Sequence, residues 1–265
     1  MTLLPNWNTL PGRIARYTQR RLGIAPYRPA TDVPFEPGGA LASVHHTRSV
    51  IAKVYLRGEG IEIGALHQPL AVPQSIRVKY IDRMTAAELR RHYPEIASTP
   101  FVETDIIDNG EELTTIADTS QDFVIANHFI EHCQNPIQTI ENFLRVLKTS
   151  GVLYLAVPEK RFTFDVKRPP TPIDHLLRDY REGPAWSKQQ HFEEWVRLVE
   201  GQPEEQLESR LQRLLAMDYS IHYHVWEAQG LLEFVATLQR MLRFEVELFL
   251  RNGFETIVIL RKAAA

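Results

Sequence analysis

The sequence predicts an α/β protein with a doubly wound, mostly parallel sheet, a C-terminal antiparallel hairpin and an inserted, mostly helical cap. From Gly60 onward, short β-rich runs alternate with helical stretches, which is typical of βαβ units and of a parallel sheet covered on both faces. Near the C-terminus, Asn252-Gly253 separates two β-rich runs, and Asn-Gly is a strong hairpin signal. Between these parts, residues 161–225 interrupt the alternation.

Five β-rich runs form the predicted parallel part of the sheet, at residues 60–64, 77–82, 101–106, 122–127 and 151–158. Helices are predicted at residues 85–93 and 136–147, and apolar residues of the second helix recur at helical spacing. A further helix at 226–242 precedes the hairpin runs at 244–251 and 255–261. This order of elements predicts a Rossmann-like architecture.

The chain divides into four predicted segments. Residues 1–45 form a Pro- and Arg-rich arm and lid, and residues 46–160 form a nucleoside-binding core. Residues 161–225 follow the carboxyl end of a strand, where open α/β sheets bind ligands, so we interpret them as a substrate cap with a helix at 202–217. Residues 226–265 complete the core.

Composition excludes several classes of protein. With 44% hydrophobic residues in 265, the chain can bury a sizeable core, and its net charge of −3 argues against coating nucleic acid. A single cysteine excludes an intrachain disulfide framework. No apolar run approaches the ~20 residues of a transmembrane helix. We therefore expect a cytoplasmic protein without a nucleic-acid partner; a basic helix at 13–22 is either a lid or a membrane-surface contact.

The turn around Gly64 is the first candidate ligand site. A buried strand ends in Glu62-Ile63-Gly64, and a glycine turn there lets the backbone approach a ligand. Neither a P-loop nor a Gly-x-Gly-x-x-Gly fingerprint is present, which argues against ATP and NAD. Asp82 closes the second run and can accept both hydroxyls of a ribose, while Asp105 and Ile106 close the third run beside a purine.

The segments GIEIGA, YID, TDI, DFVIANHFIEHCQNP and LRVLKTSGVLYLAVP resemble a class I S-adenosylmethionine-dependent methyltransferase of the bacterial small-molecule group. The resemblance covers residues 58–158 and the C-terminal hairpin. It implies that S-adenosyl-L-methionine is the cofactor. It further implies a set of cofactor-binding residues, namely Glu62, Gly64 and Ala65 at the amino-acid end, Asp82 at the ribose, Asp105 and Ile106 at the adenine, and Asn127 and His128 beside the sulfonium and the acceptor.

Two histidine groups are candidates for chemistry. His128-Phe129-Ile130-Glu131-His132 spells an inverted zinc-peptidase motif, but it directly follows a predicted strand, so we expect His132 to be packed and hydrogen-bonded. In the cap, His222 and His224 would point to one side of an extended chain. They are either a general base, which we favour, or ligands of a divalent metal, or ordinary polar residues. We assign no metal ligand.

The resemblance and the histidines together predict a methyltransferase that acts on oxygen of a small polar acceptor, such as a sugar or glycan end. His128, His222 and His224 are the catalytic candidates. Two alternatives stay open, a non-catalytic partner subunit with the same fold and a metal-dependent O-methyltransferase. Aromatic residues of the cap line either the acceptor cavity or the cap's own core: Phe162, Phe164, Trp186, Phe192, Trp195 and Trp226.

Overall fold

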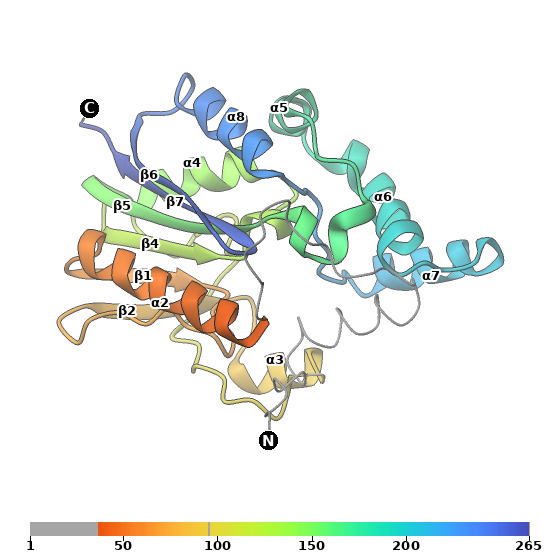
Figure 1. The fold of residues 1–265 in the computed structure, drawn as a ribbon, viewed down its shortest axis with the longest axis horizontal. Helices are drawn as coiled ribbons and strands as arrows, with labels where there is room; N and C mark the ends of the chain where they lie inside the picture. Colours follow the sequence, from red (N-terminus) through yellow and green to blue (C-terminus); the bar gives the residue numbers. More distant parts are fainter. Residues whose placement is uncertain (1–36, 95, 265) are drawn as a thin grey trace.

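The computed structural model describes residues 37–94 and 96–264, and Figure 1 shows their arrangement. The predicted basic helix at 13–22 and most of the predicted arm lie outside the described residues. Seven strands form one sheet in the order β3-β2-β1-β4-β5-β7-β6. Their bounds are β1 Glu59–Ile63, β2 Arg77–Asp82, β3 Ile106–Ile107, β4 Gln121–Asn127, β5 Leu147–Pro158, β6 Phe244–Asn252 and β7 Glu255–Lys262.

The sheet has the predicted doubly wound topology. Strands β1 to β5 are parallel, and the chain reverses its direction of growth between β1 and β4, which lie side by side. Strand β7 inserts antiparallel between β5 and β6, so the predicted hairpin closes one edge of the sheet. The predicted mostly parallel sheet with a C-terminal antiparallel hairpin is confirmed. In such sheets ligands bind at the carboxyl ends of the strands beside the switch point, here the ends of β1 and β4.

Helices cover the two faces of the sheet unequally (Figure 1). Helices α4 (Pro136–Val146) and α8 (Ala228–Leu238) pack their apolar sides on one face, against residues such as Ile63 and Val124. On the other face, α2 (Pro37–Tyr55) contributes Ile51 and Ala52 to a second core. The border we place at residue 45 falls inside α2.

Local signals explain where two of the helices begin. Helix α3 (Ala86–His92) begins at a capping box in which the Thr85 and Glu88 side chains bind each other's backbone N–H groups. Helix α4 begins with Pro136 at its first position and the Asn135 side chain as cap. The third predicted β-run is too long. Residues 101–105 are not a strand, and β3 holds only two residues. This short edge strand pairs only with the end of β2.

Residues 161–225, which we call the insertion, leave the core after β5 and return beside the point of departure. A bridge pairs Glu159 with Trp226, and the Glu159 carboxylate accepts the N–H of Ala228 at the start of α8. The insertion has its own apolar core, built around Phe192, Val196 and Leu211. Its elements are η2 (Lys160–Phe162, which starts one residue earlier), η3 (Phe164–Lys167), α5 (Ile173–Glu182), α6 (Ala185–Glu194), the π-helix η4 (Trp195–Val199) and α7 (Glu204–Ala216).

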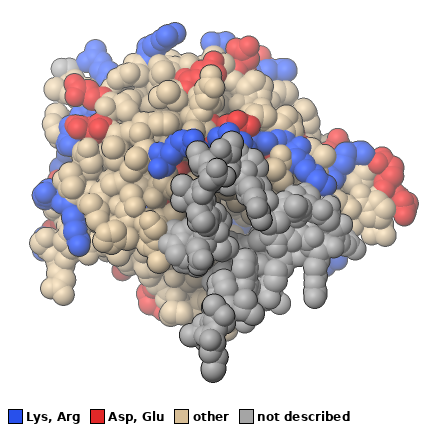
Figure 2. All heavy atoms as spheres, in the orientation of Figure 1, with Lys and Arg blue, Asp and Glu red and all other residues tan. Residues whose placement is uncertain are grey.

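Figure 1 shows the insertion beyond the end of the sheet toward which β4 and β5 run. Acidic and basic side chains are mixed over the face of the molecule in Figure 2. Among the residues that the structure describes, no helix is both long and apolar enough to cross a bilayer.

Candidate functional site

The turn after β1 is fixed by a buried carboxylate. Gly64 has a φ of 65°, a conformation that glycine adopts without strain, and its N–H donates to the Ile81 carbonyl. Both oxygens of Glu62 accept the N–H of Leu70, at 2.9 and 3.1 Å, so this side chain holds the loop that follows Gly64. Burial raises the pKa of Glu62 to about 7. Ala65 follows Gly64 in the same turn, half-buried.

The predicted adenine contact needs a correction. Asp82 ends β2 as expected, half-buried, and burial raises its pKa to about 6. Asp105 does not end a strand; it precedes β3 and is exposed, and its carboxylate accepts the N–H of Tyr80 at 2.8 Å, two residues before the end of β2. Half-buried Ile106 is the first residue of β3. Asp108 instead follows β3 directly, and its N–H donates to the Asp82 carbonyl.

Sequence reasoning passed over Asp108 because the third β-run seemed to end at residue 106. The Asp108 carboxylate is already engaged, since it accepts hydrogen bonds from Thr114, Thr115 and the backbone of Asn109. It therefore shapes the turn after β3. The order β1, β2, β3 nevertheless brings Glu62, Asp82 and this turn to one edge of the sheet.

At the end of β4 lie two polar residues, Asn127 and His128. The Nδ2 and Oδ1 atoms of Asn127 are buried and, within the described part of the chain, have no hydrogen-bond partner that meets the distance and angle criteria. The Asn127 amide still interacts with the Glu62 carboxylate, and this interaction lowers the pKa of Glu62. His128 has a φ of 50°, a strained value for a residue other than glycine. Such strain at a strand end beside a ligand edge is typical of functional sites.

A buried carboxylate from β7 orients the His128 ring. His128 Nε2 lies 2.8 Å from Glu255 Oε2, and the His128 side chain is 34% exposed whereas that of Glu255 is fully buried. Arg48 of α2 forms a bidentate ion pair with Glu255, and Asn252 donates to it at 2.9 Å. These partners hold the pKa of Glu255 at about 2 in spite of burial. Glu255 is therefore a carboxylate facing an accessible imidazole.

A second acid–histidine pair joins the insertion to the turn after β4. His222 Nδ1 lies 2.6 Å from Asp165 Oδ2, and Arg168 holds the other Asp165 oxygen at 3.0 Å. The opposite nitrogen, Nε2, lies 4.0 Å from Glu131 Oε1. Glu131 is fully buried, and burial raises its pKa. With 7% of the residue exposed, His222 is far less accessible than His128.

The two histidines of the zinc-peptidase motif have different partners in the structure. His128 turns to Glu255, whereas His132 Nδ1 binds the Ile221 carbonyl at 2.9 Å, as expected for a packed histidine. Burial lowers the pKa of His132 to about 3. His132 shares with Glu131 and His222 a set of ligand-type atoms within 4.8 Å of one another. Glu131 is on the 3-10 helix η1 (Ile130–His132), which β4 positions.

The expectation that His222 and His224 share one side is wrong. Residues 221–225 are not a strand, because the N–H groups of Tyr223 and His224 both donate to the Glu131 carbonyl. The His224 ring, which has no exposed surface, joins His175, Asp179 and His191 instead. It does not reach any surface where an acceptor can bind, so its role is not that of a base.

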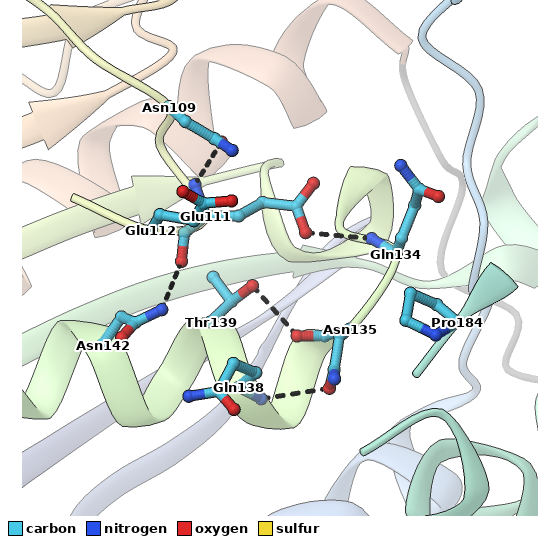
Figure 3. Close-up of a pocket in the computed structure, with 9 residues that line it drawn as sticks. All are labelled: Asn109, Glu111, Glu112, Gln134, Asn135, Gln138, Thr139, Asn142 and Pro184. Carbon is cyan, nitrogen blue, oxygen red and sulfur yellow. Dashed lines mark hydrogen bonds between the residues drawn. The ribbon is translucent and has the colours of Figure 1, made fainter. Parts of the chain in front are cut away.

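Other candidates in the insertion have mostly structural surroundings. Phe192 and Trp195 belong to the core of the insertion and Trp226 to the main core, so they do not line an open cavity. Phe162, Phe164 and Trp186 keep exposed surface. None of the residues predicted from the sequence lines the 280 Å³ cavity in Figure 3. Its lining is polar and comes from the turn after β3, the start of α4 and Pro184.

Comparison with known proteins identifies the core. Residues 58–155 match the family model described as a methyltransferase domain, and no curated protein matches the chain. A solved CurJ carbon methyltransferase is 15% identical (TM-score 0.48), with 99% of this chain aligned to 60% of that chain. A SAM-dependent methyltransferase from Methanosarcina mazei is 15% identical (TM-score 0.43; 80% and 96% covered). A Rhodobacter sphaeroides protein titled a putative Zn-dependent alcohol dehydrogenase is 12% identical (TM-score 0.50; 98% and 100% covered) and shows a shared fold alone.

The residues at the carboxyl edge fit S-adenosylmethionine. Gly64 gives the turn after β1 a positive φ, Asp82 offers a carboxylate at the place of a ribose, and the buried amide of Asn127 has no hydrogen bond that meets the distance and angle criteria among the described residues. The matched segment contains β1 to β4 and most of β5, and β7 lies antiparallel beside β5. Residues 58–155 thus carry a methyltransferase domain, and this match supports a class I S-adenosylmethionine-dependent methyltransferase.

Proposed function

We propose that the protein methylates a hydroxyl oxygen of a small polar acceptor, such as a sugar or the end of a glycan, with His128 as general base. The observation that carries this proposal is the pair formed by His128 and Glu255 at the end of β4. It combines an accessible imidazole, a buried carboxylate and a strained backbone beside the predicted cofactor edge.

The pair resembles an acid–histidine arrangement for proton abstraction. A proton on His128 Nε2 is held by the Glu255 carboxylate, which leaves the lone pair of Nδ1 for the acceptor. The acceptor hydroxyl would give its proton to Nδ1 as its oxygen bonds to the methyl carbon, while the bond from that carbon to the cofactor sulfur breaks and adenosylhomocysteine leaves. Glu255 then stabilises the imidazolium, and Arg48 and Asn252 keep Glu255 in place.

The cofactor supplies a methyl group on a positively charged sulfur, so the chain's own residues bind, orient and exclude water. We assign Glu62, Gly64 and Ala65 to its amino-acid end, Asp82 to the ribose and Asn127 with His128 to the reacting end. For the adenine, we assign Ile106 and the turn that begins at Asp108 in place of Asp105. The support is their position at the edge formed by β1 to β4.

The acceptor is proposed to lie between His128 and the segment that follows β5. This segment starts beside Glu255, because Pro158 and Glu255 are paired across β5 and β7. It carries the half-exposed rings of Phe162 and Phe164, and the Phe164 ring lies 4.7 Å from that of His222. Aromatic rings beside polar groups suit the apolar face and hydroxyl edge of a sugar.

A second candidate uses His222, held by Asp165, with Glu131 and His132 as a divalent-metal site that lowers the pKa of the acceptor hydroxyl. The observation that favours it is the set of ligand-type atoms within 4.8 Å. Burial of Glu131 and His222 makes it the weaker candidate. Dependence of turnover on added Mg²⁺ or Mn²⁺, lost in Glu131→Gln, would favour it over His128.

The test is transfer of labelled methyl from S-adenosylmethionine into small molecules and glycans of a cell extract. We expect His128→Ala to lower the rate by about 10²- to 10⁴-fold, while adenosylhomocysteine binding, measured by calorimetry, persists. His46→Ala, on the exposed side of α2, is the control. Label that resists mild base is expected, because methyl ethers survive conditions that hydrolyse methyl esters. An unchanged rate in His128→Ala removes His128 as base, and a base-labile product removes the ether.

A further inference from the structure

Four metal-ligand side chains from three parts of the insertion converge in its interior. His175 and Asp179 lie one helical turn apart on α5, His191 lies on α6, and His224 lies in the segment that leads to α8. Asp179 and His224 have no exposed surface, and His191 is 7% exposed. Each offers one ligand-type atom, and the four atoms lie within 4.8 Å of one another.

The measured separations match the edges of a tetrahedral site. His175 Nε2 lies 3.1 Å from His191 Nε2 and 3.2 Å from Asp179 Oδ2. Four ligands about 2.0–2.1 Å from a central zinc are about 3.3 Å apart, which follows from tetrahedral geometry. Both separations lie close to this value.

Two buried atoms of the cluster have no hydrogen-bond partner among the described residues. Among the described residues, Asp179 Oδ2 and His224 Nδ1 are buried without a hydrogen-bond partner, although each side chain is otherwise held. Asp179 Oδ1 accepts from Ser187 at 3.0 Å, and His224 Nε2 lies 3.3 Å from the Gln134 carbonyl. An unpaired buried carboxylate oxygen is costly, and metal ligation is one of the two common ways to satisfy it. Outer partners of this kind orient metal ligands.

We propose that His175, Asp179, His191 and His224 bind one zinc ion as a structural site. Three imidazoles and one carboxylate suit tetrahedral zinc better than Mg²⁺ or Ca²⁺, which prefer six or more oxygens. Four protein ligands leave no open position, so the ion does not activate an acceptor. It joins α5, α6 and the segment at 221–225, and thereby fixes the backbone that carries His222.

The first test is the zinc content of the full-length protein, purified without chelator and supplied with Zn²⁺. We expect one zinc per chain in the wild type and in the control His46→Ala, and loss of most of it in His191→Ala and Asp179→Asn. Glu131→Gln and His132→Ala, which alter the other histidine cluster, are expected to keep zinc. Zinc lost in these two variants but kept in His191→Ala would assign the ion to the other cluster and overturn the proposal.

A second test avoids variants that fail to fold. Removal of zinc from the wild type with a chelator is expected to lower Tm by about 5–10 °C, and added Zn²⁺ to restore it. Co²⁺ in its place is expected to give the visible absorption of a four-coordinate site. Absence of bound zinc, with a Tm that neither chelator nor Zn²⁺ changes, would overturn the proposal. Both readouts are independent of methyl transfer, so a negative result here leaves the proposed role of His128 intact.

Discussion

At the residue scale, the polar side chains around the pair of His128 and Glu255 differ in their exposure to solvent. His128 is partly accessible and strained, whereas Glu255, Arg48 and Asn252 are buried around it. A charged residue inside a core is stable only with paired partners, and Arg48 and Glu255 satisfy each other. In the proposed mechanism, Glu255 acts through His128 and is a positioning residue.

Glu255→Gln should destabilise the protein by about 3 kcal/mol at pH 7, because it leaves buried Arg48 without a charge partner. The folded-state pKa of Glu255 is about 2, below the ordinary value of 4.5, so its contribution is present above pH 4.5 and is lost as the pH falls toward 2. We therefore expect the difference in free energy of unfolding between wild type and variant to shrink from pH 7 to pH 3. Urea denaturation at both pH values measures it.

The matched control is Glu247→Gln, which breaks the ion pair with Arg261 on the partly exposed surface of β6 and β7. Surface pairs contribute at most about 1 kcal/mol, so this variant should stay close to the wild type at both pH values. A Glu255→Gln protein as stable as this control would show that the buried pair does not hold the site.

At the element scale, the contact of β1 with β4 decides where the site forms. Gly60 of β1 pairs with Phe123 of β4, and these neighbouring strands meet at the switch point. The strands approach so closely here that a side chain at position 60 does not fit, since an added Cβ would lie 2.3 Å from the Phe123 carbonyl oxygen. Gly60 is therefore required by packing.

Gly60→Ala is expected to destabilise the fold by about 2 kcal/mol or more, because backbone has to shift to admit the methyl group. Gly230→Ala is the matched control. This glycine lies in α8, and an added Cβ would lie 3.9 Å from the Trp226 ring, an ordinary contact distance. A helix-interior alanine there should stabilise by about 0.5–1 kcal/mol. Equal effects on Tm in the two variants would contradict this account of the β1–β4 contact.

At the scale of the whole molecule, the parallel sheet gathers residues that are distant in sequence. Glu62, Asp82, Asn127 and the turn at Asp108 meet at one edge because parallel strands place their carboxyl ends together. The hairpin adds Glu255 from the far end of the chain, and the insertion adds His222. The proposed site is thus assembled from all three parts of the described chain.

Asp82→Ala should weaken adenosylhomocysteine binding by about 10- to 100-fold, the effect of losing hydrogen bonds to a charged group. Asp105→Ala should leave the affinity unchanged and cost only about 1 kcal/mol of stability, because its carboxylate binds the N–H of Tyr80. Calorimetry on both variants separates the two residues. Weaker adenosylhomocysteine binding in Asp105→Ala would contradict this prediction and support the adenine contact that the sequence suggests.

Much of the fold and part of the candidate site can be predicted from the sequence, and the wrong predictions have physical causes. The alternation of runs, the Asn252-Gly253 turn and the acid at the end of β2 are local patterns, and the structure contains each of them. The third strand was misplaced because an edge strand of two residues has too short a pattern to locate. The His-x-His pair was misread because the rule of alternating sides holds only in a strand.

The sequence alone determined the order of the main elements and the class of sheet, because periodicity and turn chemistry depend on neighbouring residues. Only the tertiary structure decided which histidine meets which acid. His128 finds Glu255 across 127 positions and His224 finds Asp179 across the insertion, and neither pairing leaves a local pattern. Such contacts depend on how strands and helices pack, so a single sequence does not reveal them.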